Sequence, residues 1–111
     1  MYEYNAKLIE IVDADTFKLD VDLGFTVRVN TTFRLARINC PELLTFEGMT
    51  AKLFVVEQLR LAKALKVVST RREKYGRWLC EFYFQTGDKR SPWICLNDVL
   101  LREGYAKKYR H

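Results

Sequence analysis

The chain has 111 residues, of which 49% are hydrophobic and 14% aromatic, and 19 Lys and Arg against 14 Asp and Glu give a formal net charge of +5. This length fits one compact domain, and the aromatic content suffices for a hydrophobic core, which excludes an intrinsically disordered chain. No apolar run approaches the roughly 20 residues that a membrane span needs. The only histidine is the last residue, His111, which excludes a Ser-His or Cys-His mechanism. The positive charge is compatible with an anionic partner.

The cysteines and glycines exclude several other classes of site. Cys40, Cys80 and Cys95 are an odd number, widely spaced and without histidine companions, so we expect neither a complete disulfide set nor a zinc knuckle. The five glycines form neither a dinucleotide-binding motif nor a phosphate-binding loop. Strand-like sequence follows Met1 directly, in place of a signal peptide. We therefore expect a cytoplasmic protein with buried, reduced thiols.

The first part of the chain predicts three antiparallel strands. Tyr4–Val12 is rich in β-formers, and Thr16–Asp22 alternates strictly between apolar and polar residues, as a half-buried strand does. Asp13-Ala14-Asp15 between them is typical of a tight turn. After Gly24, Phe25–Ile38 predicts a long third strand, which Pro41 ends. Short turns between consecutive strands favour a meander.

The middle of the chain predicts one long helix over Met49–Lys66, because its hydrophobic residues recur at helical spacing. These residues are Ala51, Phe54, Val55, Leu61, Ala62 and Leu65, and Lys52, Arg60 and Lys63 lie on the opposite side.

The last part predicts two strands and a short helix. The strands are Lys66–Thr70 and Arg77–Phe84, joined by the charged loop Arg71–Gly76. The helix is Leu96–Glu103, and Gly104 ends it. Five strands with a helix after the third predict an α+β, mainly β fold for residues 1–111, a single five-stranded Greek-key barrel of the OB type with a short C-terminal helix.

Residues suited to phosphodiester hydrolysis stand at the predicted strand ends. Arg34 and Arg77 can donate two hydrogen bonds each to phosphate oxygens. Asp15 and Asn39 carry the oxygen atoms that a hard divalent cation prefers, and Glu42 can act on an attacking water. Each residue also has a simpler structural explanation, as part of a turn, a solvated strand face or a strand end.

Four motifs in order resemble the staphylococcal nuclease (thermonuclease) family over nearly the whole chain. They are Asp13-Ala14-Asp15-Thr16, Phe33-Arg34-Leu35 running into Asn39-Cys40-Pro41-Glu42, Lys74-Tyr75-Gly76-Arg77, and Leu100 to Ala106. The resemblance implies an OB-fold barrel with a calcium-dependent phosphodiesterase activity on DNA and RNA. A free-standing domain of this kind without an export signal is compatible with a phage or plasmid origin. No protein partner and no membrane is implied, and we expect a monomer.

The resemblance also implies a role for each site residue. Asp15, Asn39 and the backbone carbonyl of Cys40 would bind Ca²⁺, and Asp13 would orient metal-bound water. Arg34 and Arg77 would bind the scissile phosphate, and Glu42 would act on the water as base or orienter. Lys74 and Tyr75 would contact the neighbouring phosphate and sugar, and Tyr109 would stack near the base.

Two features of the chain depart from the family pattern. Asn39 is neutral where the family has an aspartate, so we expect weaker calcium binding, because affinity rises with the number of carboxylates. The loop after Glu42 is short and apolar. The alternative to an active nuclease is therefore a weak or inactive OB-fold module that binds single-stranded nucleic acid. A third reading is a structural protein-interaction domain.

Overall fold

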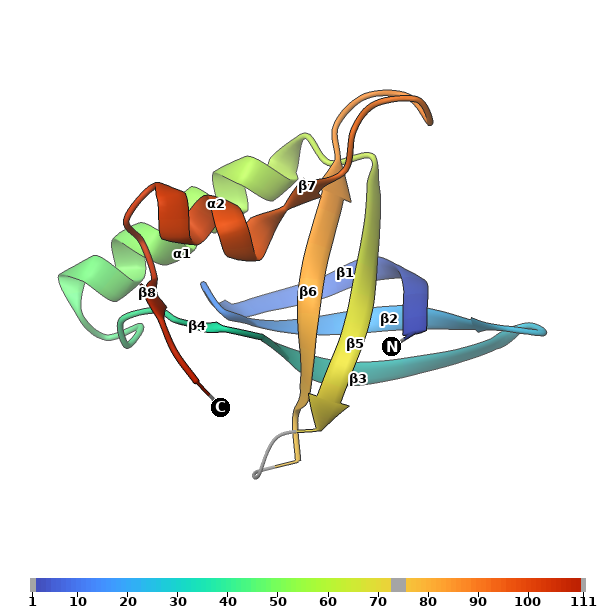
Figure 1. Cartoon of the computed structure of the whole chain (residues 1–111), viewed down its shortest axis with the longest axis horizontal. Helices are drawn as coiled ribbons and strands as arrows, with labels where there is room; N and C mark the ends of the chain where they lie inside the picture. Colours follow the sequence, from blue (N-terminus) through green and yellow to red (C-terminus); the bar gives the residue numbers. More distant parts are fainter. Residues whose placement is uncertain (1, 73–75, 111) are drawn as a thin grey trace.

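The computed structural model describes residues 2–72 and 76–110 of the chain (Figure 1). The strands are β1 Tyr2–Asp13, β2 Thr16–Gly24, β3 Val27–Leu35, β4 Ile38–Asn39, β5 Ala64–Arg72, β6 Trp78–Gln85, β7 Ile94–Cys95 and β8 Lys107–Lys108. The helices are α1 Phe46–Arg60 and α2 Leu96–Arg102. Neither helix of the described residues has the length and apolar composition needed to cross a bilayer.

Strands β1, β2 and β3 form the predicted antiparallel meander. Only Ala14 and Asp15 separate β1 from β2. At the next turn Phe25 and Thr26 both take positive φ angles, 54° and 63°, which is the conformation of the tight hairpin turn whose twist matches that of the strands. The prediction that Phe25 begins the third strand is therefore wrong, because the hairpin needs Phe25 at its tip, where it is 98% exposed.

The barrel closes because β1 pairs with two partners and β3 returns to β6. Residues 2–6 of β1 pair with β5, and residues 6–13 pair with β2. Strand β5 continues into an antiparallel pair with β6, and β6 runs parallel to β3 from Phe33 opposite Trp78 to Leu35 opposite Cys80. The result is a closed five-stranded, OB-like barrel, in which β5 and β6 cross the meander at a steep angle (Figure 1).

Helix α1 follows β4, but its predicted bounds are wrong. It begins at Phe46, where Thr45 caps it by accepting a hydrogen bond from the Gly48 N–H at 3.0 Å, and it ends at Arg60. Lys63 then donates its backbone N–H to the carbonyl of Gln85 at 2.7 Å. Sheet pairing with β6 therefore takes residues 64–66 out of the helix, although their apolar spacing continues the helical period.

The remaining differences from the predicted elements are smaller. The third strand is interrupted after Leu35, because Arg37 takes a φ of 68°, and the chain resumes as β4. Strand β5 is longer than predicted at both ends and includes Arg71 and Arg72. Ile38 of β4 is the last residue of the predicted third strand, whereas the short strands β7 and β8 carry no pattern of their own and lie outside the predicted strands. The C-terminal helix is confirmed to within one residue, with Gly104 at a φ of 82° after it.

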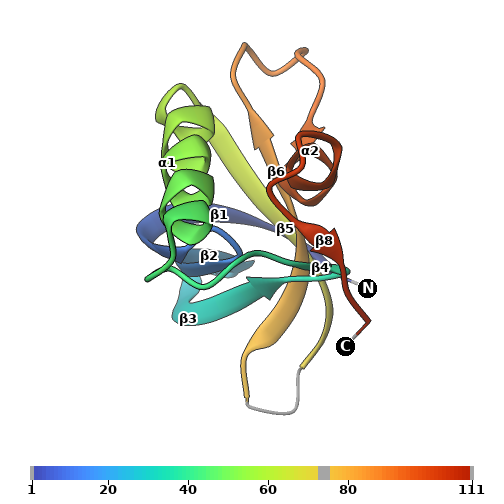
Figure 2. The ribbon, with the colours of Figure 1, turned by 90° about the vertical axis from the view of Figure 1, so that its left-hand side faces the viewer.

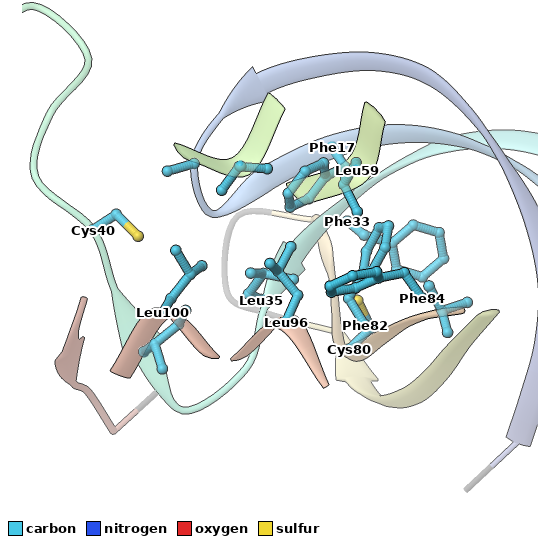
Figure 3. Close-up of a cluster of buried hydrophobic side chains, with 14 of the residues drawn as sticks. Phe17, Phe33, Leu35, Cys40, Leu59, Cys80, Phe82, Phe84, Leu96 and Leu100 are labelled. Atoms are coloured by element: carbon cyan, nitrogen blue, oxygen red, sulfur yellow. The ribbon is translucent and has the colours of Figure 1, made fainter. Parts of the chain in front are cut away.

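The core fills the barrel and extends under the helices. Figure 2 shows the two helices on different sides of the barrel, where α1 packs against β1 and α2 against β6. Four phenylalanines gather at the centre, and leucines of β3 and α2 continue the cluster toward Cys40 (Figure 3). Alternation along β2 and β6 places these side chains inward, as predicted. The three cysteines are free thiols, two of them buried.

Candidate functional site

Asp15 occupies the two-residue turn between β1 and β2, and its side chain is only 9% exposed. One carboxylate oxygen accepts from the hydroxyl of Thr16 at 3.1 Å. The other accepts from the backbone N–H of Cys40 at 3.0 Å. The Asp15 backbone carbonyl also accepts from the Leu35 N–H at 2.9 Å. These bonds tie the first hairpin to the end of β3 and to β4, so the sequence-distant motifs of residues 13–16 and 39–42 meet.

Arg34 lies between Asp15 and Asn39. Its Nη2 is 3.5 Å from the Asp15 carboxylate and donates to the Asn39 amide oxygen at 2.5 Å. The Arg34 side chain is 10% exposed, and its guanidinium lies 5.5 Å from the ring centroid of Tyr109. Strand alternation explains the placement, because Phe33 and Leu35 point into the core and Arg34 must point out of the barrel.

Four charged side chains from four segments act on the carboxyl group of Asp13, the last residue of β1. Burial raises the pKa of the Asp13 carboxyl, and the neighbouring charges of Asp15 and Glu42 raise it further. The positive charges of Lys52 and Arg77 act in the opposite direction on the same pKa. Proposed phosphate-binding and carboxylate groups therefore lie within electrostatic range of one another at this end of the barrel.

The side chain of Cys40 has no role as a thiolate here. Burial, followed by the negative charge of Asp15, raises the pKa of its thiol to about 12. The thiol therefore stays protonated at neutral pH, and it is neither a nucleophile nor a soft metal ligand. Cys40 contributes its backbone N–H to this region, as donor to Asp15 at 3.0 Å, whereas the resemblance implied a role for its carbonyl oxygen.

Glu42 is exposed and stands at the start of the turn that leads into α1. Its carbonyl accepts from the Thr45 N–H at 3.0 Å and from the Thr45 hydroxyl at 2.6 Å. A Cβ at Gly48 would collide with this same carbonyl, so the first turn of α1 packs directly against the Glu42 backbone. The N-terminus of α1 thereby sets the position of Glu42.

Arg77 and Tyr109 are the other predicted site residues whose positions the structure describes. Arg77 is half-buried immediately before β6 and reaches Asp13 through its charge. Tyr109 is 50% exposed, and its N–H donates to the Arg37 carbonyl at 2.8 Å. Lys74 and Tyr75 lie outside the described residues.

Sequence reasoning missed two residues of this region. The helical pattern places Lys52 on the solvated face of the helix, yet its positive charge acts on Asp13 and opposes the raised pKa of that carboxyl. Gly48 belongs to none of the motifs. The one available signal is its position at the start of the helix, because a glycine inside a helix costs about 1 kcal/mol relative to alanine and needs a structural reason.

The oxygen atoms around Arg34 fit a hard cation. The Asp15 carboxylate and the Asn39 amide already converge on one positive group, the guanidinium, and both are donors of the type that Ca²⁺ takes. Among the described residues no group of three or more His, Cys, Asp or Glu is arranged to hold a metal. This set has one carboxylate, where a tight calcium site uses several, and a cation bound there would compete with the Arg34 guanidinium for the same oxygen atoms.

No protein-family model matches the chain, and a search of curated proteins found no match either.

Proposed function

We propose that this protein is a calcium-dependent phosphodiesterase that hydrolyses DNA, with RNA as a second substrate, and that it acts as a monomer in the cytoplasm. The observation that carries the proposal is the meeting of Arg34, Asp15 and Asn39 in one hydrogen-bonded group. Asp13, beside that group, feels the charges of Glu42 and Arg77 as well. A structural role alone would not require all of these groups at one end of the barrel.

The charged side chains divide the work of the reaction. Arg34 and Arg77 bind the non-bridging oxygens of the phosphodiester, where negative charge grows as water attacks phosphorus. Glu42 orients this water or takes its proton, and its exposed position leaves room for both. The bond from phosphorus to the leaving sugar oxygen then breaks, and that oxygen takes up a proton. Lys74 and Tyr75 contact the next phosphate and sugar, and Tyr109 lies near the base.

Calcium would be held by the Asp15 carboxylate, the Asn39 amide oxygen and the Cys40 carbonyl, and it would supply positive charge to the phosphate oxygens. Asp13 orients water beside these ligands. Because Arg34 bonds to two of the same oxygens, its guanidinium turns from Asn39 to the substrate phosphate when the site is in use.

The decisive test is cleavage of a single-stranded DNA oligonucleotide with excess calcium and with EDTA. We expect calcium-dependent cleavage that falls about 100-fold or more in Glu42→Gln and Arg34→Ala, since each removes transition-state stabilisation of several kcal/mol. Arg28→Ala is the matched control, because Arg28 lies on the same strand and pairs with Asp20 at 3.1 Å, outside the site. Equal cleavage by all four proteins would show a contaminating nuclease and would end the proposal.

The second candidate function is a module that binds single-stranded nucleic acid without cutting it. The observation that favours it is the position of the Arg34 guanidinium, which donates to Asn39 at 2.5 Å and lies 3.5 Å from the Asp15 carboxylate, so that Asp15 has a positive neighbour without a metal ion. Such a protein would bind an oligonucleotide with a steep salt dependence and leave it intact in calcium. Calcium-stimulated cleavage that is lost in Asp15→Ala would exclude this candidate.

A further inference from the structure

A pocket lies at the mouth of the barrel next to the β2–β3 hairpin, and none of the site residues described above lines it. Its volume is about 440 Å³, within the size range of small-ligand sites. Tyr2, Tyr4, Phe33 and Trp78 supply its aromatic walls. The β2–β3 hairpin projects past the rest of the barrel, away from both helices (Figure 1).

The described residues that line the pocket are mainly aromatic and aliphatic, and none of them is acidic. The rings of Tyr2 and Tyr4 stack with centroids 6.3 Å apart, and Trp78 is 39% exposed. The hydroxyls of Thr31 and Ser69 add donors and acceptors to an otherwise apolar lining. Aromatic faces with a few hydrogen-bonding groups suit a planar heteroaromatic ring.

Positive charge stands beside the aromatic wall. The Arg72 guanidinium lies 5.7 Å from the ring centroid of Trp78 and donates to the Gly76 carbonyl at 3.2 Å. Trp78 also follows Arg77 directly in the chain, and it lies opposite Phe33 in the parallel pair of β3 and β6. Phe33 in turn precedes Arg34. Because Phe33 points into the barrel and Arg34 points out of it, Arg34 lies on the other face of β3, and Arg72 is the cation that stands beside the pocket.

We propose that this pocket binds an unpaired nucleobase of the nucleic-acid strand on which the protein acts, with the Arg72 guanidinium beside the phosphate of that nucleotide. The inference rests on the proposed function for the identity of the strand. A planar ring that carries an anionic phosphate matches both the aromatic walls and the adjacent Arg72 guanidinium, whereas an aliphatic ligand or a second copy of this chain would leave this charge without a partner in the ligand.

The test measures binding in EDTA, so that cleavage does not interfere. Trp93→Phe leaves Trp78 as the only tryptophan, and we expect an oligothymidylate to quench its fluorescence. Trp78→Ala and Tyr2→Ala should each weaken binding of the oligonucleotide about 5- to 100-fold, the usual loss for one stacked base. Tyr2 is 71% exposed, so its variant keeps the assay valid if Trp78→Ala fails to fold.

An abasic oligonucleotide of the same length is the matched ligand, because it carries the phosphates without the bases. We expect both variants to bind it as the unsubstituted protein does. An equal loss for the abasic and the ordinary oligonucleotide, or an unchanged Trp78 signal on binding, would overturn the pocket assignment. So would a dimer in sedimentation experiments that Tyr2→Ala dissociates. Failure of the unsubstituted protein to bind either oligonucleotide would instead refute the proposed function.

Discussion

At the scale of single residues, Arg34 holds the place where a cation would bind. Its guanidinium lies against the Asp15 carboxylate, and both side chains are about nine-tenths buried. Removing one partner of a buried pair is costly, because the other charge stays behind in a poorly solvated position. In the folded state Arg34 therefore gives the Asp15 carboxylate a positive partner, and a metal ion at the proposed site would have to compete with this guanidinium.

We predict that Arg34→Gln lowers the free energy of unfolding by about 3 kcal/mol in EDTA. Excess calcium should restore part of this loss, because an ion bound to the native state stabilises it by mass action. Urea unfolding with and without calcium measures both effects. The double variant Asp15→Asn, Arg34→Gln is the control, and an equal gain from calcium in that protein would contradict the assignment of Asp15 as a ligand.

Asn97 is a second single residue on which the fold depends, because its polar side chain is buried and bonds to the backbone of three other residues. It is fully buried at the start of α2. Its amide oxygen accepts from the Phe82 N–H at 2.9 Å, and its amide nitrogen donates to the carbonyls of Ala36 and Cys80 at 2.9 and 3.1 Å. One side chain thus connects α2 to β6 and to the turn after β3.

We predict that Asn97→Ala lowers the free energy of unfolding by about 2–4 kcal/mol, since the Phe82 N–H and the carbonyls of Ala36 and Cys80 each lose one hydrogen bond. Asn30→Ala on the exposed part of β3 should change it by less than about 0.5 kcal/mol. Chemical denaturation of the two variants and the unsubstituted protein measures these free energies of unfolding. Similar stabilities would mean that water replaces the Asn97 amide.

At the scale of elements, the start of α1 acts as the support of Glu42. Gly48→Ala would normally stabilise a helix by about 1 kcal/mol. Here the added Cβ meets the Glu42 carbonyl and lies 2.9 Å from that of Pro41, so we expect a net loss of about 1–3 kcal/mol from overpacking. Cleavage should fall together with stability, because the turn that carries Glu42 must shift.

Met49→Ala is the control for this prediction, because Met49 follows Gly48 on the same helix and is 55% exposed. We expect its cleavage rate and its unfolding midpoint to stay near those of the unsubstituted protein. Urea unfolding and the oligonucleotide cleavage assay are run on both variants. A Gly48→Ala protein with full activity would show that Glu42 does not depend on the helix start.

At the scale of the whole molecule, the chain carries a net charge of +5, and in the proposed function Arg34 and Arg77 supply part of this charge to the phosphates of the substrate. Each phosphate neutralised on a single strand contributes about −0.7 to the slope of log K against log salt concentration. We predict that Arg77→Ala reduces the magnitude of this slope by about 0.7. Arg60→Ala should leave it unchanged, because Arg60 lies at the far end of α1 and pairs with Glu57. Fluorescence titrations at several salt concentrations in EDTA test both statements.

The chain itself determined the barrel strands, the two helices and the set of candidate residues, because these depend on local patterns. Alternation in β2 and β6 follows from having one buried face, and Gly104 ends α2 wherever that helix packs. Only the tertiary structure decided where α1 ends, since the pairing of β5 with β6 competes with a helical period that runs on through Leu65. It also decided that Arg34 lies between Asp15 and Asn39, and that Gly48 supports Glu42. Contacts between residues far apart in the chain have no periodicity, so no local pattern predicts them.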